Sequence, residues 1–309
     1  RSWCPFCVKG RGVGIEHKRT DEERRVPVFG FDYLLGTYDG TASGEEQVKI
    51  LVAKCQYSKC VFAHVVPQKG IDPDLYAVER LTGDMLWLGH SRIILKSDNE
   101  GAIVALLKNI IKALRIENIE NTQEAHPAAY DSSSNASTEN TCKQVAGMIR
   151  TLKARLESRI KMRMPASHCI FAWMVKQATW LLSTRTTQSD GISPYKRLRG
   201  RNFPTRMLGF GEVRLFKLNT KAPQKSIDGK MGARWREGVF LGYSRDSNEF
   251  VLWNVPDKTV TRARSIQRLP ESGRWSAEEL MMVNQKPCDV LYRAAAPLSN
   301  RKEPDQGFD

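Results

Sequence analysis

Long uncharged hydrophobic runs are missing from this chain of 309 residues. No window approaches the roughly 18 apolar residues that a membrane-spanning helix requires. The start, RSWCPFC, also lacks the basic and then apolar pattern of a secretory signal. The seven cysteines are few and odd in number, which argues against a disulfide framework and suits a reducing compartment. We therefore expect a globular protein without a membrane segment, whose thiols are free or bind metal.

Acidic residues are scarce in one part of the chain only. Overall, 48 Lys and Arg stand against 34 Asp and Glu, which gives a formal net charge of +14. Residues 26–139 carry 10 basic and 15 acidic side chains, whereas residues 140–268 carry 26 basic and 8 acidic ones. Surplus Lys and Arg attract phosphate backbones by releasing condensed counterions. This basic block predicts contact with nucleic acid; improved solubility is the alternative explanation.

Hydrophobic periodicity indicates strands and helices in alternation. Apolar, β-branched runs predict strands at 26–36, 49–67 and 93–98, and three more short strands within 235–269. Apolar positions three and four residues apart predict helices at 73–89, 101–116, 139–160 and 169–184. The polar residues 117–138 are expected to form a mobile loop, and the basic residues 193–206 another loop.

Three carboxylates occupy positions where such a sheet presents functional groups. Asp32 lies inside the first apolar strand, where a carboxylate costs free energy unless a cation or hydrogen bonds compensate it. Asp98 ends the strand IILKSD, and Glu139 opens the helix after the polar loop. Three such carboxylates are able to hold two divalent ions about 3.5–4 Å apart for phosphoryl transfer, and hard oxygen ligands favour Mg²⁺ or Mn²⁺. Taken singly, each is equally explained as a turn residue or a helix-dipole partner.

Basic side chains near these carboxylates are candidates for phosphate contacts. On the helix 139–160 they share the side of Glu139, and in the segment 193–206 they are placed to clamp a DNA backbone. The candidates are Lys143, Arg150, Lys153, Arg197, Arg199 and Arg201. For the helix, a solvated charged face is the alternative.

The order of these motifs resembles the integrase region of a copia-type (LTR) retrotransposon Pol polyprotein, with a retroviral-type integrase catalytic core. LKSDNEGAI is similar to the second-aspartate motif, and SNASTENTCKQVAGMIRTLKARLE to the loop and glutamate-bearing helix. VFGFDYLLG takes the place of the first-aspartate strand. Downstream, TWLLSTRTTQSDGISPYKRLRGRNFPTRMLGFGEVRLFK and WREGVFLGYSRDSNEFVLWNVPDKTVTRARSI resemble the segments that follow the core. The sequence departs from the family at Asn99-Glu100-Gly101, where Asn-Gly-Gly is common.

The resemblance implies an α/β fold, a ribonuclease H-like mixed sheet flanked by helices, followed by a small C-terminal β-barrel-like unit. It divides the chain into a truncated zinc-module remnant and linker (1–25), the integrase catalytic core (26–200), a basic connector with the small barrel (201–270) and a disordered tail (271–309). In the family's zinc module two histidines precede the cysteine pair, which is Cys4 and Cys7 here. Because half a site holds zinc weakly, Zn²⁺ is expected only if upstream histidines are present; two ordinary thiols are the alternative.

The implied activity is that of a metal-dependent polynucleotidyl transferase that processes DNA 3′ ends and joins them to target DNA. Asp32, Asp98 and Glu139 would be the catalytic, metal-binding residues, with Mg²⁺ or Mn²⁺ as cofactor. The implied partners are element ends, target DNA and further copies of the chain, in the nucleus after a cytoplasmic particle stage. Two alternatives stay open: a nuclease of the same fold, and a decayed or co-opted protein that binds nucleic acid without catalysis.

Overall fold

The computed structural model describes residues 26–36, 47–97, 100–117, 119, 136–217 and 233–291, and the backbone of 121–125. Asp98, Cys4 and Cys7 lie outside the described residues, as does the segment 292–309. No described helix is long and apolar enough to cross a membrane.

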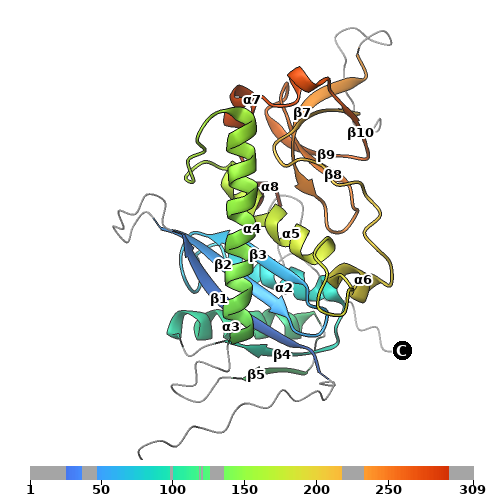
Figure 1. Ribbon diagram of the computed structural model, residues 1–309. Coiled ribbons are helices and arrows are strands. Elements are labelled where there is room, and N and C mark those ends of the chain that lie inside the picture. Colours follow the sequence, from blue (N-terminus) through green and yellow to red (C-terminus); the bar gives the residue numbers. More distant parts are fainter. Residues whose placement is uncertain are drawn as a thin grey trace, which may run out of the picture.

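The first half of the chain forms a mixed five-stranded sheet in the order β3-β2-β1-β4-β5 (Figure 1). Its strands are β1 (Val28–Gly36), β2 (Val48–Cys55), β3 (Val61–Val66), β4 (Arg92–Lys96) and β5 (Asn121–Ala125). The pairs β1–β2 and β2–β3 are antiparallel, whereas β4 runs parallel to both β1 and β5. This sheet confirms the predicted α/β fold class. The strand β5 corrects the expectation of an unbroken loop over 117–138, because parallel pairing with β4 orders a polar segment that has no strand pattern of its own.

Helices cover both faces of this sheet, in agreement with the alternation of side chains along its strands. They are α2 (Tyr76–Leu88), α3 (Gly101–Ile116), α4 (Ala136–Ile160) and α5 (Ile170–Thr184). On β2, Leu51 and Ala53 pack into the core with α2 and α3, while Ile50 and Val52 pack into the core with α4 and α5. Figure 1 shows α4 crossing the sheet on one side, with α2 and α3 behind it.

A second, antiparallel sheet follows in the order β10-β6-β7-β8-β9. Its strands are β6 (Val213–Lys217), β7 (Trp235–Tyr243), β8 (Phe250–Asn254), β9 (Thr259–Ala263) and β10 (Ser265–Arg268). Only Arg264 separates β9 from β10, yet these strands form opposite edges, so the sheet must curl strongly. The barrel-like unit stays a prediction, because no ladder joins β9 to β10 among the described strands. The aromatic side chains Phe240, Tyr243 and Trp253 are buried in this part of the fold.

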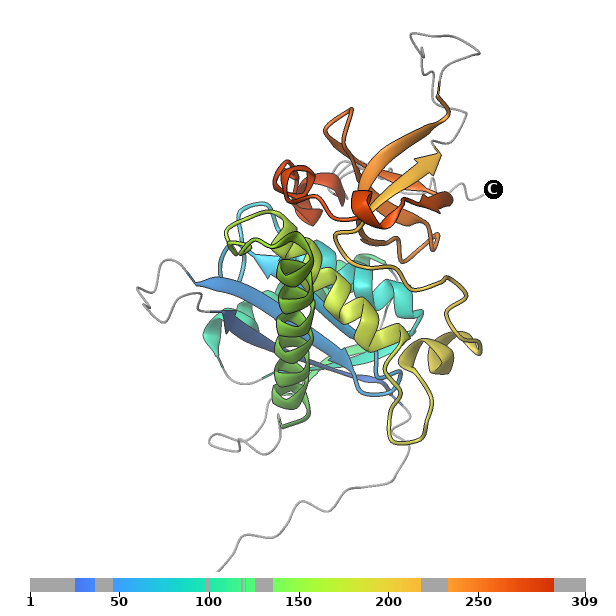
Figure 2. The ribbon, with the colours of Figure 1, turned by 45° about the horizontal axis from the view of Figure 1, so that its top comes forward.

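The two sheets share one hydrophobic core, which extends along α4. Figure 2 shows the second sheet beside the layer formed by α4 and α5. Val61 of β3, Trp173 of α5 and Leu241 of β7 belong to the same cluster. The predicted boundary at 200/201 therefore does not separate two independent cores. The connector contains α6 (Pro194–Arg199), a helix where a loop was expected, because Ser193 caps it through the backbone N–H of Lys196.

Part of the predicted disordered tail is folded. The structure contains η3 (Glu271–Gly273), α7 (Ala277–Met281) and α8 (Pro287–Leu291). Leu280 and Val283 are buried in the shared core, and the indole N–H of Trp173 donates to the carbonyl of Gln285 at 2.8 Å. The expectation of disorder was wrong for 271–291 because two apolar side chains at the right spacing suffice to fix a short segment on an existing core.

Candidate functional site

Asp32 projects from the centre of the first sheet towards α4. Its strand neighbours Phe29 and Phe31 pack into the core with α2 and α3, so the alternate positions, Gly30 and Asp32, face the helix pair on the other side. The helix approaches β1 closely at Gly30, where an added Cβ atom would overlap the hydroxyl oxygen of Thr138. The absence of a side chain at residue 30 thus allows the first turn of α4 to lie on β1.

This approach brings the predicted glutamate to the region of the predicted aspartate. Glu139 follows Thr138 directly and is exposed, in the first turn of α4. One turn further, the buried Cys142 thiol contacts the Oδ2 atom of Asp32 at 3.9 Å, while Oδ1 of Asp32 accepts the N–H of Tyr33 at 2.7 Å. Burial raises the pKa of Cys142 to about 12, and the negative charges of Asp32 and Glu139 both contribute. Two carboxylates therefore act on the same thiol.

The strand that precedes the third predicted carboxylate, Asp98, is β4. Lys96, the last residue of β4, pairs with Gly30 in parallel register, two positions before Asp32. Asp98 itself lies outside the described residues. Among the residues that the structure describes, no group of three or more His, Cys, Asp or Glu side chains is arranged to hold a metal. The described part of the site thus consists of two carboxylates, Asp32 and Glu139, with Cys142 between their elements.

The donor set fits a hard divalent cation. Carboxylate oxygens are the ligands that Mg²⁺ and Mn²⁺ prefer. A cation placed between two carboxylates also removes the like-charge repulsion that raises the pKa of Cys142. Cys142 was not among the residues singled out from the sequence as functional. Its position three residues after Glu139, on the inner side of the same helix, was a usable signal.

The predicted phosphate contacts on α4 differ in their surroundings. Lys143 and Arg150 are exposed on the same helix as Glu139. At 1.5 Å per residue, they lie about 6 Å and 16 Å along the helix axis from it. Lys153 instead forms an ion pair with Glu157, at 3.6 Å between the charged atoms. An exposed pair of this kind is weak, so Lys153 remains available to phosphate at a small cost.

The arginines after α5 are held by the protein. Arg197 pairs with Asp190, and Arg199 lies over the Trp87 ring at 4.6 Å and donates to the carbonyl of Trp87 at 3.0 Å. Arg201 is exposed beyond the end of α6. The structure therefore does not place Arg197 and Arg199 as free clamps in a loop. Arg199 connects α6 to α2, and Arg197 connects α6 to the turn that precedes it.

A second ionic cluster was missed by sequence reasoning. The carboxylate of Asp84 in α2 is fully buried; it is hydrogen-bonded to His64 at 2.7 Å and forms an ion pair with Arg245, which follows β7. Burial opposes the ionisation of Asp84, but Arg245 and His64 together hold its pKa below its usual range. The members of this cluster come from elements 20 or more residues apart in the sequence, so no local pattern of residues indicates it.

Comparisons with known proteins find only distant structural similarities. No protein-family model matches the chain, and no curated protein matches it. Among solved structures, the HTLV-2 integrase catalytic core with magnesium, in its dimeric form, is 10% identical with a TM-score of 0.39 over 56% of this chain and 94% of that one. Its trimeric form is 11% identical, with a TM-score of 0.38 over 56% of this chain and 95% of that one. A chain of the simian T-cell lymphotropic virus intasome in complex with the PP2A regulatory subunit B56 gamma is 12% identical. Its TM-score is 0.37 over 79% of this chain and 81% of that one.

Proposed function

We propose that this protein is a metal-dependent polynucleotidyl transferase that trims DNA 3′ ends and joins them to a second duplex, as in the integrase region of a copia-type Pol polyprotein. The observation that carries the proposal is the packing of α4 on β1. It brings Asp32 into contact with Cys142, three residues after Glu139 on α4, and β1 lies beside β4, the strand that precedes Asp98. The motif order of the sequence and the basic block of 140–268 support the same assignment.

Asp32, Asp98 and Glu139 would hold the divalent ions. Bound there, such ions supply activation of the attacking oxygen and charge neutralisation at the leaving oxygen. The residues of the protein would position the carboxylates and the DNA. β1 and α4 fix two carboxylates on one rigid contact, and the exposed Lys143 and Arg150 hold phosphates along the helix. We further propose DNA ends, target DNA and other copies of this chain as partners, with action in the nucleus after a cytoplasmic particle stage.

The test is a DNA joining assay with Mg²⁺ or Mn²⁺ and a labelled duplex that carries the terminal sequence of the element. The parent protein should give trimmed and joined products. Glu139→Gln should reduce them to the background of a metal-free reaction, because it keeps the size of the side chain but removes the charge. Glu278→Gln, an exposed position on α7, is the matched control and should react like the parent.

DNA affinity should be the same in all three proteins, since the basic surface is unchanged. Products that are cut but never joined would support the nuclease alternative. Tight DNA binding without metal-dependent products would support the non-catalytic alternative. A Glu139→Gln variant as active as the parent would show that Glu139 is misassigned.

A further inference from the structure

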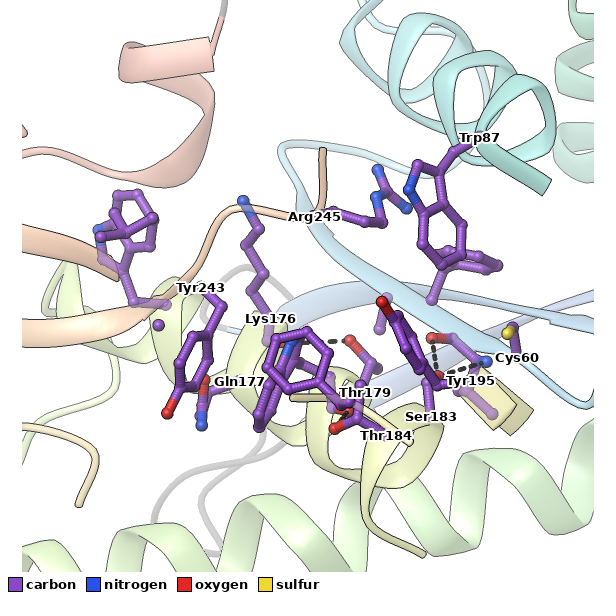
Figure 3. Close-up of a pocket in the computed structure, with 18 of the residues that line it drawn as sticks. Cys60, Trp87, Lys176, Gln177, Thr179, Ser183, Thr184, Tyr195, Tyr243 and Arg245 are labelled. Atoms are coloured by element: carbon purple, nitrogen blue, oxygen red, sulfur yellow. Dashed lines mark hydrogen bonds between the residues drawn. The ribbon is translucent and has the colours of Figure 1, made fainter. Parts of the chain in front are cut away.

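Two adjoining cavities lie where β3, α5 and the segment after β7 meet. The larger one has a volume of about 70 Å³ and is lined mainly by aromatic and apolar side chains (Figure 3). The smaller one has a volume of about 40 Å³. The two share Ala63, His64, Lys176 and Arg245. In Figure 3, Lys176 and Arg245 extend to the same side of the larger cavity, with Arg245 against Trp87.

The smaller cavity has a one-sided charge. Five basic side chains from separate parts of the fold line it, and among the described residues no Asp or Glu does. They are His64, Arg80, Lys176, Arg245 and Lys286. The nearby carboxylate of Asp84 is buried behind them and is already bound to His64 and Arg245. The lining therefore has an excess of positive charge facing an open space.

The surplus of positive charge affects the protonation of Lys176. It is half-buried, its ammonium lies 5.6 Å from the centroid of the Trp173 ring, and it forms no ion pair with the residues that the structure describes. Burial lowers its pKa to about 7, and Arg245 and Arg80 lower it further than Asp84 can offset. A cation in such surroundings is stabilised by an added negative charge.

Arg80 supplies a second, independent observation. Its Nε atom is buried and has no hydrogen-bond partner among the residues that the structure describes. A carboxylate oxygen of Glu79 lies 4.0 Å from a different guanidinium nitrogen of Arg80. Buried donors in folded proteins are nearly always paired, so an unpaired guanidinium N–H beside a cavity marks a place for an acceptor.

We propose that this cavity binds a small phosphate-type anion. Its volume holds about three water molecules at the usual 10–15 Å³ each, which suits one tetrahedral oxyanion and excludes a duplex. Lys176, Arg80 and Lys286 would donate to the anion. Because these residues come from α5, α2 and the turn before α8, the anion would join the core sheet to the C-terminal elements. The site involves neither Asp32 nor Glu139, so it is independent of the proposed DNA chemistry.

The test is the melting temperature of the full chain, without metal or duplex, titrated with inorganic phosphate at constant ionic strength. The parent should show a rise in melting temperature that grows with the logarithm of phosphate concentration, as expected for a ligand that binds only the folded state. Chloride at the same ionic strength should give none. Lys176→Met should lose most of the rise, whereas Lys108→Met, at an exposed position on α3, should keep it.

A second arm identifies the source of the phosphate. A short single strand with a 5′-phosphate is compared with the same strand ending in a hydroxyl. A shift that requires the 5′-phosphate and Lys176, without any effect of inorganic phosphate, assigns the site to a strand end. A shift with inorganic phosphate assigns it to a free anion. Equal shifts in Lys176→Met and the parent, or no shift with either ligand, would overturn the proposal. If Lys176→Met does not fold, Lys286→Gln decides, because Lys286 is exposed and its loss should weaken the same shift.

Discussion

Thr138 of α4 lies directly over Gly30 of β1, with its hydroxyl oxygen in the space that a Cβ atom of residue 30 would occupy. This contact sets how closely the helix approaches the sheet. The same contact sets the relative positions of the candidate catalytic residues Asp32 and Glu139, because Asp32 lies on β1 and Glu139 lies on α4. A small residue on a central strand thereby becomes part of the construction of the site.

Replacing Gly30 by alanine should destabilise the protein by about 1–3 kcal/mol, the usual cost of overpacking a core, and lower metal-dependent DNA joining. Denaturant unfolding measures the first effect. The control is Gly83→Ala in the interior of α2, where no atom lies within 4 Å of the added methyl group. It should stabilise the protein by about 0.5–1 kcal/mol. Adding Thr138→Ala to Gly30→Ala should recover part of the loss, since the two positions are in contact.

The double variant Lys143→Gln/Arg150→Gln should weaken DNA binding and reduce the slope of log affinity against log salt by about two, one for each lost phosphate contact. Both side chains are exposed on the face of α4 that carries Glu139. Lys108→Gln/Lys112→Gln on α3 removes the same charge from exposed positions in the acidic half of the chain. An equal effect of both double variants would show that net charge, not the α4 surface, governs binding.

Stability should rise with pH from 7 to 8.5 in the absence of phosphate. The pKa of Lys176 is about 7 in the folded protein against 10.5 as its ordinary value, so the unfolded chain binds more protons in between. The destabilisation is complete below pH 7 and disappears by pH 10.5. The buried thiols Cys60 and Cys142, with pKa raised to about 12 from 9.0, act in the opposite direction above pH 9. Unfolding of Lys176→Met across this range should show a smaller slope; an unchanged slope would mean that Lys176 titrates normally.

Leu280→Ala should cost about 2–5 kcal/mol, as for other fully buried leucines. Leu280 lies in the core shared by both sheets, beside Leu156 and Gly211. Met281→Ala, at a neighbouring side chain that is 40% exposed, should change stability by less than about 0.5 kcal/mol. Calorimetry of the two variants would decide whether α7 belongs to the folded core, and similar melting temperatures would contradict it.

Much of the fold was predictable because its signals are local. The short apolar run at 50–53 indicates a buried strand, and the three- and four-residue spacing along 101–116 indicates a helix; both signals lie within short stretches of sequence. β5 and α7 were not predicted, because their order depends on partners far along the chain, β4 for one and the core around Leu156 for the other.

By itself, the sequence determined the type and order of most elements, the basic block, and the choice of Asp32 and Glu139 as candidates. Only the tertiary structure decided that Asp32 contacts Cys142 of the helix that carries Glu139, that Arg197 and Arg199 bind Asp190 and Trp87, and that His64, Asp84 and Arg245 form one cluster. The physical reason is the distance along the chain over which each kind of interaction acts. Backbone propensity and hydrophobic period act over a few residues, whereas the charge and hydrogen-bond partners of a side chain are set by whichever element the packing brings beside it.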